Sequence, residues 1–126
     1  MDRQILGRRA EWLALLLLLV KGHRPRHRNW RGAGGELDLV VERGREIVFV
    51  EVKARTSELY GGAAAAVNAA KRRHIVRAST AYLSAHELWE RPCRYDIVTV
   101  ERRRRFPFWR IRHLRDAFRP DLGRRL

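Results

Sequence analysis

Cysteine is nearly absent from this chain, since Cys93 is the single one among 126 residues. One thiol excludes an internal disulfide and any zinc site built from several cysteines. The five histidines share no ligand spacing that would replace the missing thiols, so we expect no zinc site. We predict a protein of the reducing cytoplasm in which Cys93 is a small packing residue.

Long apolar runs are missing as well. The longest, Trp12–Val20, covers nine residues, about half of the ~20 that a membrane-spanning helix needs. It also begins too far into the chain, and lacks the small-residue cleavage site, for a signal peptide. The run therefore predicts a buried helix in a soluble protein, and we expect no membrane partner.

Acidic residues are few relative to basic ones. The chain has 14 Asp and Glu against 28 Lys and Arg, a formal net charge of +14 and a pI of about 11.5. Such a charge attracts polyanions, nucleic acid first, although a generally arginine-rich proteome would account for part of the excess. The length suits one domain over residues 1–126, with a basic tail at about 119–126.

Hydrophobic periodicity predicts an α/β chain with the order α-β-β-β-α-β-β. The first weak strand is the basic segment 23–31, which contains Pro25 and is either a poor edge strand or a loop. The last segment, 114–126, is either a short helix or a basic tail. The other predicted elements are helices over 7–21 and 63–88 and strands over 36–42, 46–53, 95–100 and 108–113.

The same periodicity predicts which side chains face the core. In the first helix we expect Trp12, Leu15, Leu16 and Leu19 to form the buried stripe. In the strand 36–42 we expect Leu37, Leu39 and Val41 to share one face.

Two acidic residues and a lysine interrupt the most apolar strands: Asp38 in one strand, and Glu51 and Lys53 in the next. A two-residue turn, either Arg43-Gly44 or Gly44-Arg45, would place all three side chains on one face of a hairpin. The Gly44-Arg45 turn would set Asp38 directly opposite Glu51. Buried charges are costly unless a metal or a partner compensates them, so this convergence indicates a functional site.

The chemistry of these residues suits a hard divalent cation. Mg²⁺ takes oxygen ligands and keeps several waters, so Asp38 and Glu51 suffice to hold it, with the Val52 carbonyl as an extra ligand. Lys53 would orient a water or neutralise charge on a phosphate. Glu11 would add a third carboxylate if the first helix packs across the sheet. The alternative is an exposed hairpin whose acids and lysine form ordinary ion pairs.

Six sequence blocks together resemble the YraN-like family of small bacterial proteins. The resemblance implies the restriction-endonuclease-like fold of the PD-(D/E)xK nuclease superfamily, an αβββαβ core with a central mixed sheet flanked by helices, similar to archaeal Holliday-junction resolvases. It assigns the superfamily's helix acid to Glu11, its metal-binding aspartate to Asp38 and its E-x-K to Glu51 and Lys53. The blocks are GRRAE (7–11), NWRGAGGELDLV (29–40), VFVEVKAR (48–55), KRR (71–73), RYDIV (94–98) and IRHLRDAF (111–118).

The chain departs from the family pattern in two places. The family usually has glycine where this chain has Ala10, which is a mild change. The family has an apolar strand after Gly22, whereas this chain reads His-Arg-Pro-Arg-His, which leaves the first strand in doubt and the acidic site intact.

We therefore predict a Mg²⁺-dependent endonuclease, with Mn²⁺ as a substitute, that hydrolyses phosphodiester bonds in structured or branched DNA. Resolvase relatives act as symmetric dimers, so a homodimer is a hypothesis. The alternatives are a non-catalytic nucleic-acid-binding module on the same fold and an RNA- or ribosome-associated protein. We expect Trp30 to be a packing residue rather than a side chain that stacks on an unpaired base. We expect Asp96 to be structural, either pairing with Arg94 or capping the edge of the core. The predicted backbone-contacting residues are Arg31, Arg55, Lys71, Arg72 and Arg73.

Overall fold

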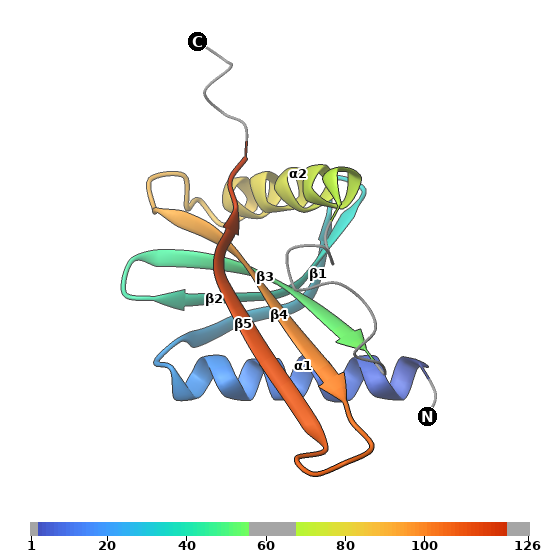
Figure 1. The fold of residues 1–126 in the computed structure, drawn as a ribbon. Coiled ribbons are helices and arrows are strands. Elements are labelled where there is room, and N and C mark those ends of the chain that lie inside the picture. The colour runs from blue at the N-terminus through green and yellow to red at the C-terminus, as the bar shows by residue number, and fades with distance from the viewer. Residues whose placement is uncertain (1–2, 56–67, 121–126) are drawn as a thin grey trace.

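The described part of the chain forms a five-stranded sheet with one helix on each face (Figure 1). The computed structural model describes residues 3–55 and 68–120. No helix in these residues is long and apolar enough to cross a membrane. The elements in chain order are α1 (Arg3–Val20), β1 (Arg24–Gly32), β2 (Gly35–Arg43), β3 (Glu46–Arg55), α2 (Ala69–Ala85), β4 (Cys93–Arg102) and β5 (Trp109–Phe118).

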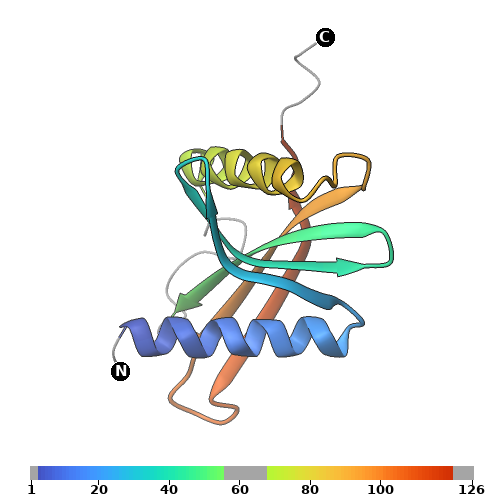
Figure 2. The ribbon, with the colours of Figure 1, turned by 180° about the vertical axis from the view of Figure 1, so that it is seen from behind.

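The sheet is mixed, as predicted, and its strand order is the chain order β1-β2-β3-β4-β5. Strands joined by short turns pair antiparallel. Strands β3 and β4 pair parallel, because the connection through α2 brings the chain back to the end of the sheet at which β3 begins. This order confirms the α/β class and is consistent with the restriction-endonuclease-like αβββαβ core, to which β5 adds an outer strand. The view from behind in Figure 2 shows α1 and α2 on opposite sides of the sheet.

Each helix covers its own apolar cluster. On the α2 side Ile75, Ala78 and Tyr82 pack against Phe49 and Ile97. On the α1 side the buried helix residues are Leu6, Ala10, Ala14, Leu15 and Leu18.

The predicted stripe on α1 is therefore wrong for three of its four members, because Trp12, Leu16 and Leu19 are exposed and Leu15 alone is buried. Nearly every position after Trp12 is apolar, so periodicity could not select the buried face. Small Ala10 and Ala14 lie on that face, where their size lets α1 approach the sheet.

The β2–β3 hairpin has the two-residue turn Gly44-Arg45, because Arg43 pairs with Glu46. Gly44 takes φ 61°, a conformation that favours glycine. This is the turn that sets Asp38 opposite Glu51.

The face prediction for β2 is wrong at Leu37. Leu39 and Val41 pack on the α1 side, but Leu37 packs on the α2 side. Leu37 pairs with Trp30 of β1, and Leu39 pairs with Arg28. Asn29, between these two partners, has a left-handed φ of 52°. The regular alternation of side chains is therefore interrupted where β1 and β2 pair at this point.

The structure decides three segments that the sequence left open or misplaced. Segment 24–32 is an edge strand, with an irregularity between Pro25 and His27. Residues 114–118 extend β5 and are not helical. In α2 Asn68 accepts a hydrogen bond from the Lys71 amide as the N-cap, so the helix begins later than predicted there; residues 63–67 lie outside the described part of the chain.

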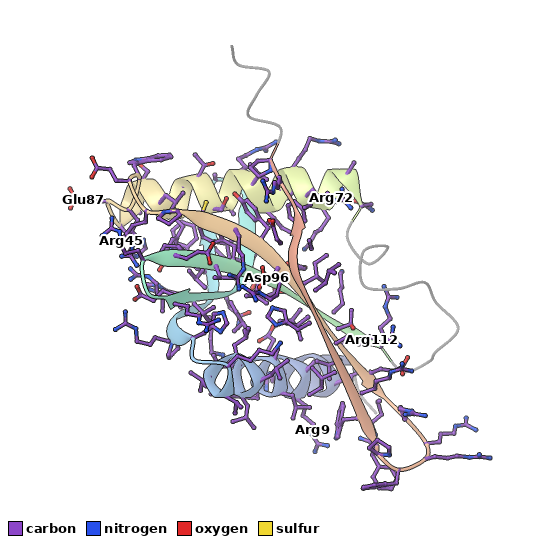
Figure 3. All side chains as sticks on the ribbon, turned by 60° about the vertical axis from the view of Figure 1, so that its left-hand side comes forward. Arg9, Arg45, Arg72, Glu87, Asp96 and Arg112 are labelled. Carbon is purple, nitrogen blue, oxygen red and sulfur yellow. The ribbon has the colours of Figure 1, made fainter. Side chains whose placement is uncertain are left out.

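A buried polar network joins the ends of α1, β4 and β5. Asp96 is fully buried and accepts hydrogen bonds from Arg94 (2.9 and 3.2 Å), His113 (2.7 Å) and the Asp116 amide (2.9 Å). Burial alone would raise the pKa of Asp96, but these donors outweigh it and lower the pKa. Figure 3 shows Asp96 in the interior. The hydrogen bonds from Arg94 confirm the predicted pairing of these two residues.

Cys93, by contrast, is exposed and not a packing residue. It is the first residue of β4, ahead of the buried run that begins at Arg94.

Candidate metal and nucleic-acid site

Asp38 and Glu51 come together because β2 and β3 are adjacent antiparallel strands. Their last ladder pair is Leu39 with Val50, and Asp38 and Glu51 follow directly beyond it. The Val52 amide donates a hydrogen bond of 2.9 Å to Asp38 Oδ2 and so fixes that carboxyl group. The apolar neighbours that define the strands also bury the acids, since the Glu51 side chain is only 5% exposed.

Burial and mutual repulsion change the acidity of this pair. Loss of hydration, the negative charge of Glu51 and a carboxyl–carboxyl hydrogen bond raise the pKa of Asp38 to about 7, although the Val52 amide and Lys71 oppose the shift. Burial also raises the pKa of Glu51, against the lowering effect of Lys71 and Lys53. Two carboxyl groups with raised pKa values, held side by side, form a site that gains from a nearby cation.

Two lysines approach the pair from different elements. Lys53 follows Glu51 by two residues on β3, so its side chain leaves the same face of the sheet. Lys71, on the first turns of α2, places Nζ 3.3 Å from Glu51 Oε1. The sequence predicted Lys71 as a backbone contact and missed its place beside Glu51, because only the packing of α2 on the sheet brings the two together.

Glu11 lies apart from the other two acids. Its carboxylate accepts a hydrogen bond from Asn29 Nδ2 (3.3 Å) and lies 3.7 Å from Arg28, both on β1. Burial raises the pKa of Glu11, and the charge of Asp38 adds to the increase while Asn29 and Arg28 oppose it. Among the described residues no three Asp, Glu, His or Cys side chains gather closely enough to share one ion. The helix acid is thus a neighbour of the pair and not a third member of a compact triad.

The comparisons with known proteins cover the elements that build this site. The model of the uncharacterised protein family UPF0102 matches residues 10–100, from Ala10 on α1 to Val100 on β4. The chain belongs to this family. That membership confirms the YraN-like resemblance read from the sequence blocks.

Members of UPF0102 are found in several bacterial groups. The chain is 49% identical over 113 residues to a UPF0102 protein of Methylorubrum extorquens, with 89% of this chain and 83% of the relative covered. It is 40% identical over 116 residues to one of Nitratidesulfovibrio vulgaris, covering 92% and 85%. A third, from Stutzerimonas stutzeri, is 42% identical over 100 residues, covering 79% and 83%. Their names state the family and no activity.

The remaining predicted residues of this UPF0102 protein divide into two groups. Arg31 and Lys71 line a groove of about 670 Å³ between the β1–β2 turn and α2, together with Glu36 and His74. Arg31 is 80% exposed, and its Nε lies 3.9 Å from Glu36. This groove leads to the lysine that contacts Glu51, so it joins a basic surface to the acidic pair.

The second group lies outside that groove. Arg72 packs its guanidinium over the ring of Phe118 at 5.4 Å, and Arg73 is exposed on α2. Arg55 lies at the end of β3, on the same face as Lys53. Val52 packs against the α1-side cluster, so only its backbone groups serve the site. Trp30 packs edge-on to Tyr82 at 5.2 Å between ring centroids, and the packing interpretation is confirmed.

Proposed function

We propose that this UPF0102 protein is a Mg²⁺-dependent nuclease that hydrolyses phosphodiester bonds in structured or branched DNA. The observation that carries the proposal is the Asp38–Glu51 pair: two buried carboxyl groups with raised pKa values, next to Lys53 and Lys71. Lys71 pairs with Glu51, but none of the ion pairs among the described residues includes Asp38, and the two carboxyl groups repel each other once both are ionised. That arrangement supports a cation-binding role.

The donor set fits a small divalent cation. Asp38 and Glu51 would hold it through carboxylate oxygens and Val52 through its carbonyl, which is enough for an ion that retains several waters. Glu11 would act from the side, as a neighbouring negative charge. A bound Mg²⁺ or Mn²⁺ would supply the Lewis acidity that phosphodiester hydrolysis needs.

The chain's own residues would then position and stabilise the reacting groups. Lys53, on the same face as Glu51, would orient the attacking water or neutralise charge that develops on the phosphate oxygens. Lys71 would compensate the negative charge of Glu51 whenever no cation is bound. The Val52 amide would keep Asp38 oriented. Arg31, Arg55, Arg72 and Arg73 would contact the nucleic-acid backbone without reading its sequence.

The first test is calorimetry with Mg²⁺ and Mn²⁺ on the parent and on Asp38→Asn. We expect binding heat in the parent and none in the variant, because the amide removes one of two anionic ligands and leaves the hydrogen bond from Val52 in place. Arg43→Ser, at the far end of the same hairpin, is the control and should bind metal as the parent does. No heat from the parent at millimolar metal would contradict the proposal.

The second test is cleavage of labelled four-way junction, flap, duplex and single-stranded DNA, each compared with the matching RNA. We expect Lys53→Ala to lower the cleavage rate about 10²-fold or more, because it removes a cation that acts on the transition state. Metal binding should persist in this variant. Cleavage unaffected by the substitution would assign the activity to another site or to a contaminant.

A non-catalytic nucleic-acid-binding module is the second candidate. It is favoured by the Lys71–Glu51 ion pair and by the Arg28–Glu11 pair, which compensate two of the acids without a metal. In that case nucleic acid would bind equally well with chelator or with metal, and no substrate would be cleaved.

A further inference from the structure

The β4–β5 hairpin ends in an aromatic and basic tip, defined here as residues 103–108 (RRRRFPFWR spans 102–110). Phe106 is 83% exposed and Phe108 is 51% exposed, and their rings meet edge-on at 6.0 Å. Arg104 and Arg105 are exposed beside them. Exposed large apolar side chains mark a surface for a partner, and the flanking cations favour a partner that is anionic.

A hydrogen bond and side-chain packing hold the base of the tip in place. The Arg103 amide donates a 2.7 Å hydrogen bond to the Phe108 carbonyl across the base of the turn. Below it Trp109 packs against the α1-side cluster, and the Arg102 guanidinium lies 5.2 Å from its ring centroid. The two phenylalanines are therefore presented on a supported hairpin.

Strand register connects the tip to the acidic pair. Lys53 pairs with Thr99 and Thr99 with Arg112; Arg55 pairs with Glu101 and Glu101 with Arg110. Paired residues project from one face of a sheet, so these two rows lie on the face that carries Glu51. Ile111 packs on the α1 side, which agrees with that assignment.

The rows form a basic lane, defined as Lys53, Arg55, Arg110 and Arg112, that runs from the acids toward the tip. One acid, Glu101, lies within it. Arg110 and Arg112 are exposed, and Figure 3 shows Arg112 on the outside of β5, near the hairpin and remote from Arg45. Such a lane follows a phosphate backbone.

The spacing between the two features suits a branch point. Ile97 lies opposite Glu51, and Arg103, the first residue of the tip, follows it by six residues, just past the end of β4. At ~3.3 Å per residue this is roughly 20 Å. That length corresponds to about six nucleotides of duplex at ~3.4 Å each.

We propose that the tip is a wedge for unpaired bases: Phe106 and Phe108 stack on bases exposed at a branch about six nucleotides from the phosphate held at Asp38 and Glu51. The inference extends the proposed function by naming the structural feature of the substrate that is recognised. The match of the family model ends at residue 100, before the tip. A membrane surface would also accept arginine and phenylalanine, but it would not use the lane that leads to the acids.

The test measures binding without cleavage, by anisotropy of a labelled fork with unpaired arms and of a fully paired duplex of equal charge, in chelator. We expect the parent to prefer the fork, and Phe106→Ala/Phe108→Ala to lose about tenfold in fork affinity for each stacked base while its duplex affinity stays unchanged. Phe106→Tyr/Phe108→Tyr should keep the preference, because tyrosine stacks as well.

A direct probe and a matched control accompany the affinities. A 2-aminopurine at the first unpaired position should be quenched by the parent and not by the alanine variant. Trp89→Ala is the control, since Trp89 is 58% exposed in the α2–β4 connection, at the other end of β4 from the tip (Figure 1). Thermal melting checks that each variant is folded.

Three outcomes would overturn the wedge. The first is a parent protein that binds fork and duplex equally well. The second is an alanine variant that keeps the fork preference. The third is an alanine variant that loses binding to anionic vesicles but keeps its binding to both DNA substrates. Absence of metal binding or cleavage would overturn the nuclease proposal and leave this result standing, because the binding measurements contain no metal.

Discussion

At the scale of single residues, the acidic pair destabilises the folded protein when both carboxyl groups are ionised. In the folded chain the pKa of Asp38 is raised to about 7, whereas an aspartate in an unfolded chain titrates near ~3.9. The folded state therefore binds more protons between these values, and its free energy of unfolding falls as the pH rises from about 4 to about 7. A bound cation would reverse that cost.

Asp38→Asn should stabilise the metal-free protein by about 1–3 kcal/mol at pH 8, because it removes an ionised carboxylate from beside Glu51. At pH 4, close to the pKa that an aspartate has in the unfolded chain, most of the difference should vanish. Urea unfolding in chelator at both pH values measures the effect. Asp116→Asn, whose carboxylate pairs with Arg119 on the surface, should show no such pH dependence. A variant less stable than the parent at pH 8 would contradict the repulsion argument.

At the scale of elements, the position of α2 depends on a close approach to β2. A Cβ added to Gly35 would lie 2.9 Å from the His74 carbonyl oxygen and 3.2 Å from the Ala78 Cβ. Gly35 opens β2 three residues before Asp38, and His74 follows Lys71 on α2. The packing of this pair of elements therefore sets the distance between Lys71 and Glu51.

Gly35→Ala should destabilise the protein by about 1–3 kcal/mol, because helix backbone must move to admit the methyl group. Gly7→Ala is the control: a Cβ there meets nothing within 4 Å on α1, and an alanine in a helix should gain about 0.5–1 kcal/mol. Chemical denaturation measures both. Equal stability of Gly35→Ala and the parent would show that the helix moves freely away from the sheet.

At the scale of the whole molecule, we expect the basic residues behind the net charge of +14 to differ in their contribution to nucleic-acid binding. Arginines occur at both ends of the sheet, and Figure 3 shows Arg45 and Arg112 far apart. Only those in line with the acidic pair should track bound nucleic acid, while the rest add to long-range attraction.

Arg110→Ser/Arg112→Ser should lower the salt dependence of DNA binding by about 1.8 in the slope of log affinity against log salt, since each phosphate contact contributes about 0.9. Arg43→Ser/Arg45→Ser removes the same charge from the β2–β3 turn and should change the slope little. Titrations at several salt concentrations in chelator measure both slopes. Equal slopes for the two double variants would mean that net charge alone governs binding.

Much of the fold was predictable because its signals are local. Alternating apolar residues around Gly44 defined the hairpin, and either two-residue turn placed Asp38, Glu51 and Lys53 on one face. The mixed sheet was implied by the family resemblance. The ends of elements were predicted less well where local signals conflict. Residues 114–118 include Arg115 and Asp116 and yet belong to β5, where Leu114 pairs with Ile97 and Phe118 with Tyr95 of β4.

The sequence by itself determined the β2–β3 hairpin and the shared face of Asp38, Glu51 and Lys53, since period-two alternation and a glycine turn act over a few residues. The tertiary structure decided which of the two possible turns sets the register, which face of the apolar helix α1 is buried, that Lys71 reaches Glu51, and that Glu11 contacts Arg28 and Asn29 on β1. It also aligned Arg110 and Arg112 with Lys53. These relations depend on how helices pack and strands pair across long stretches of chain, which no local pattern encodes.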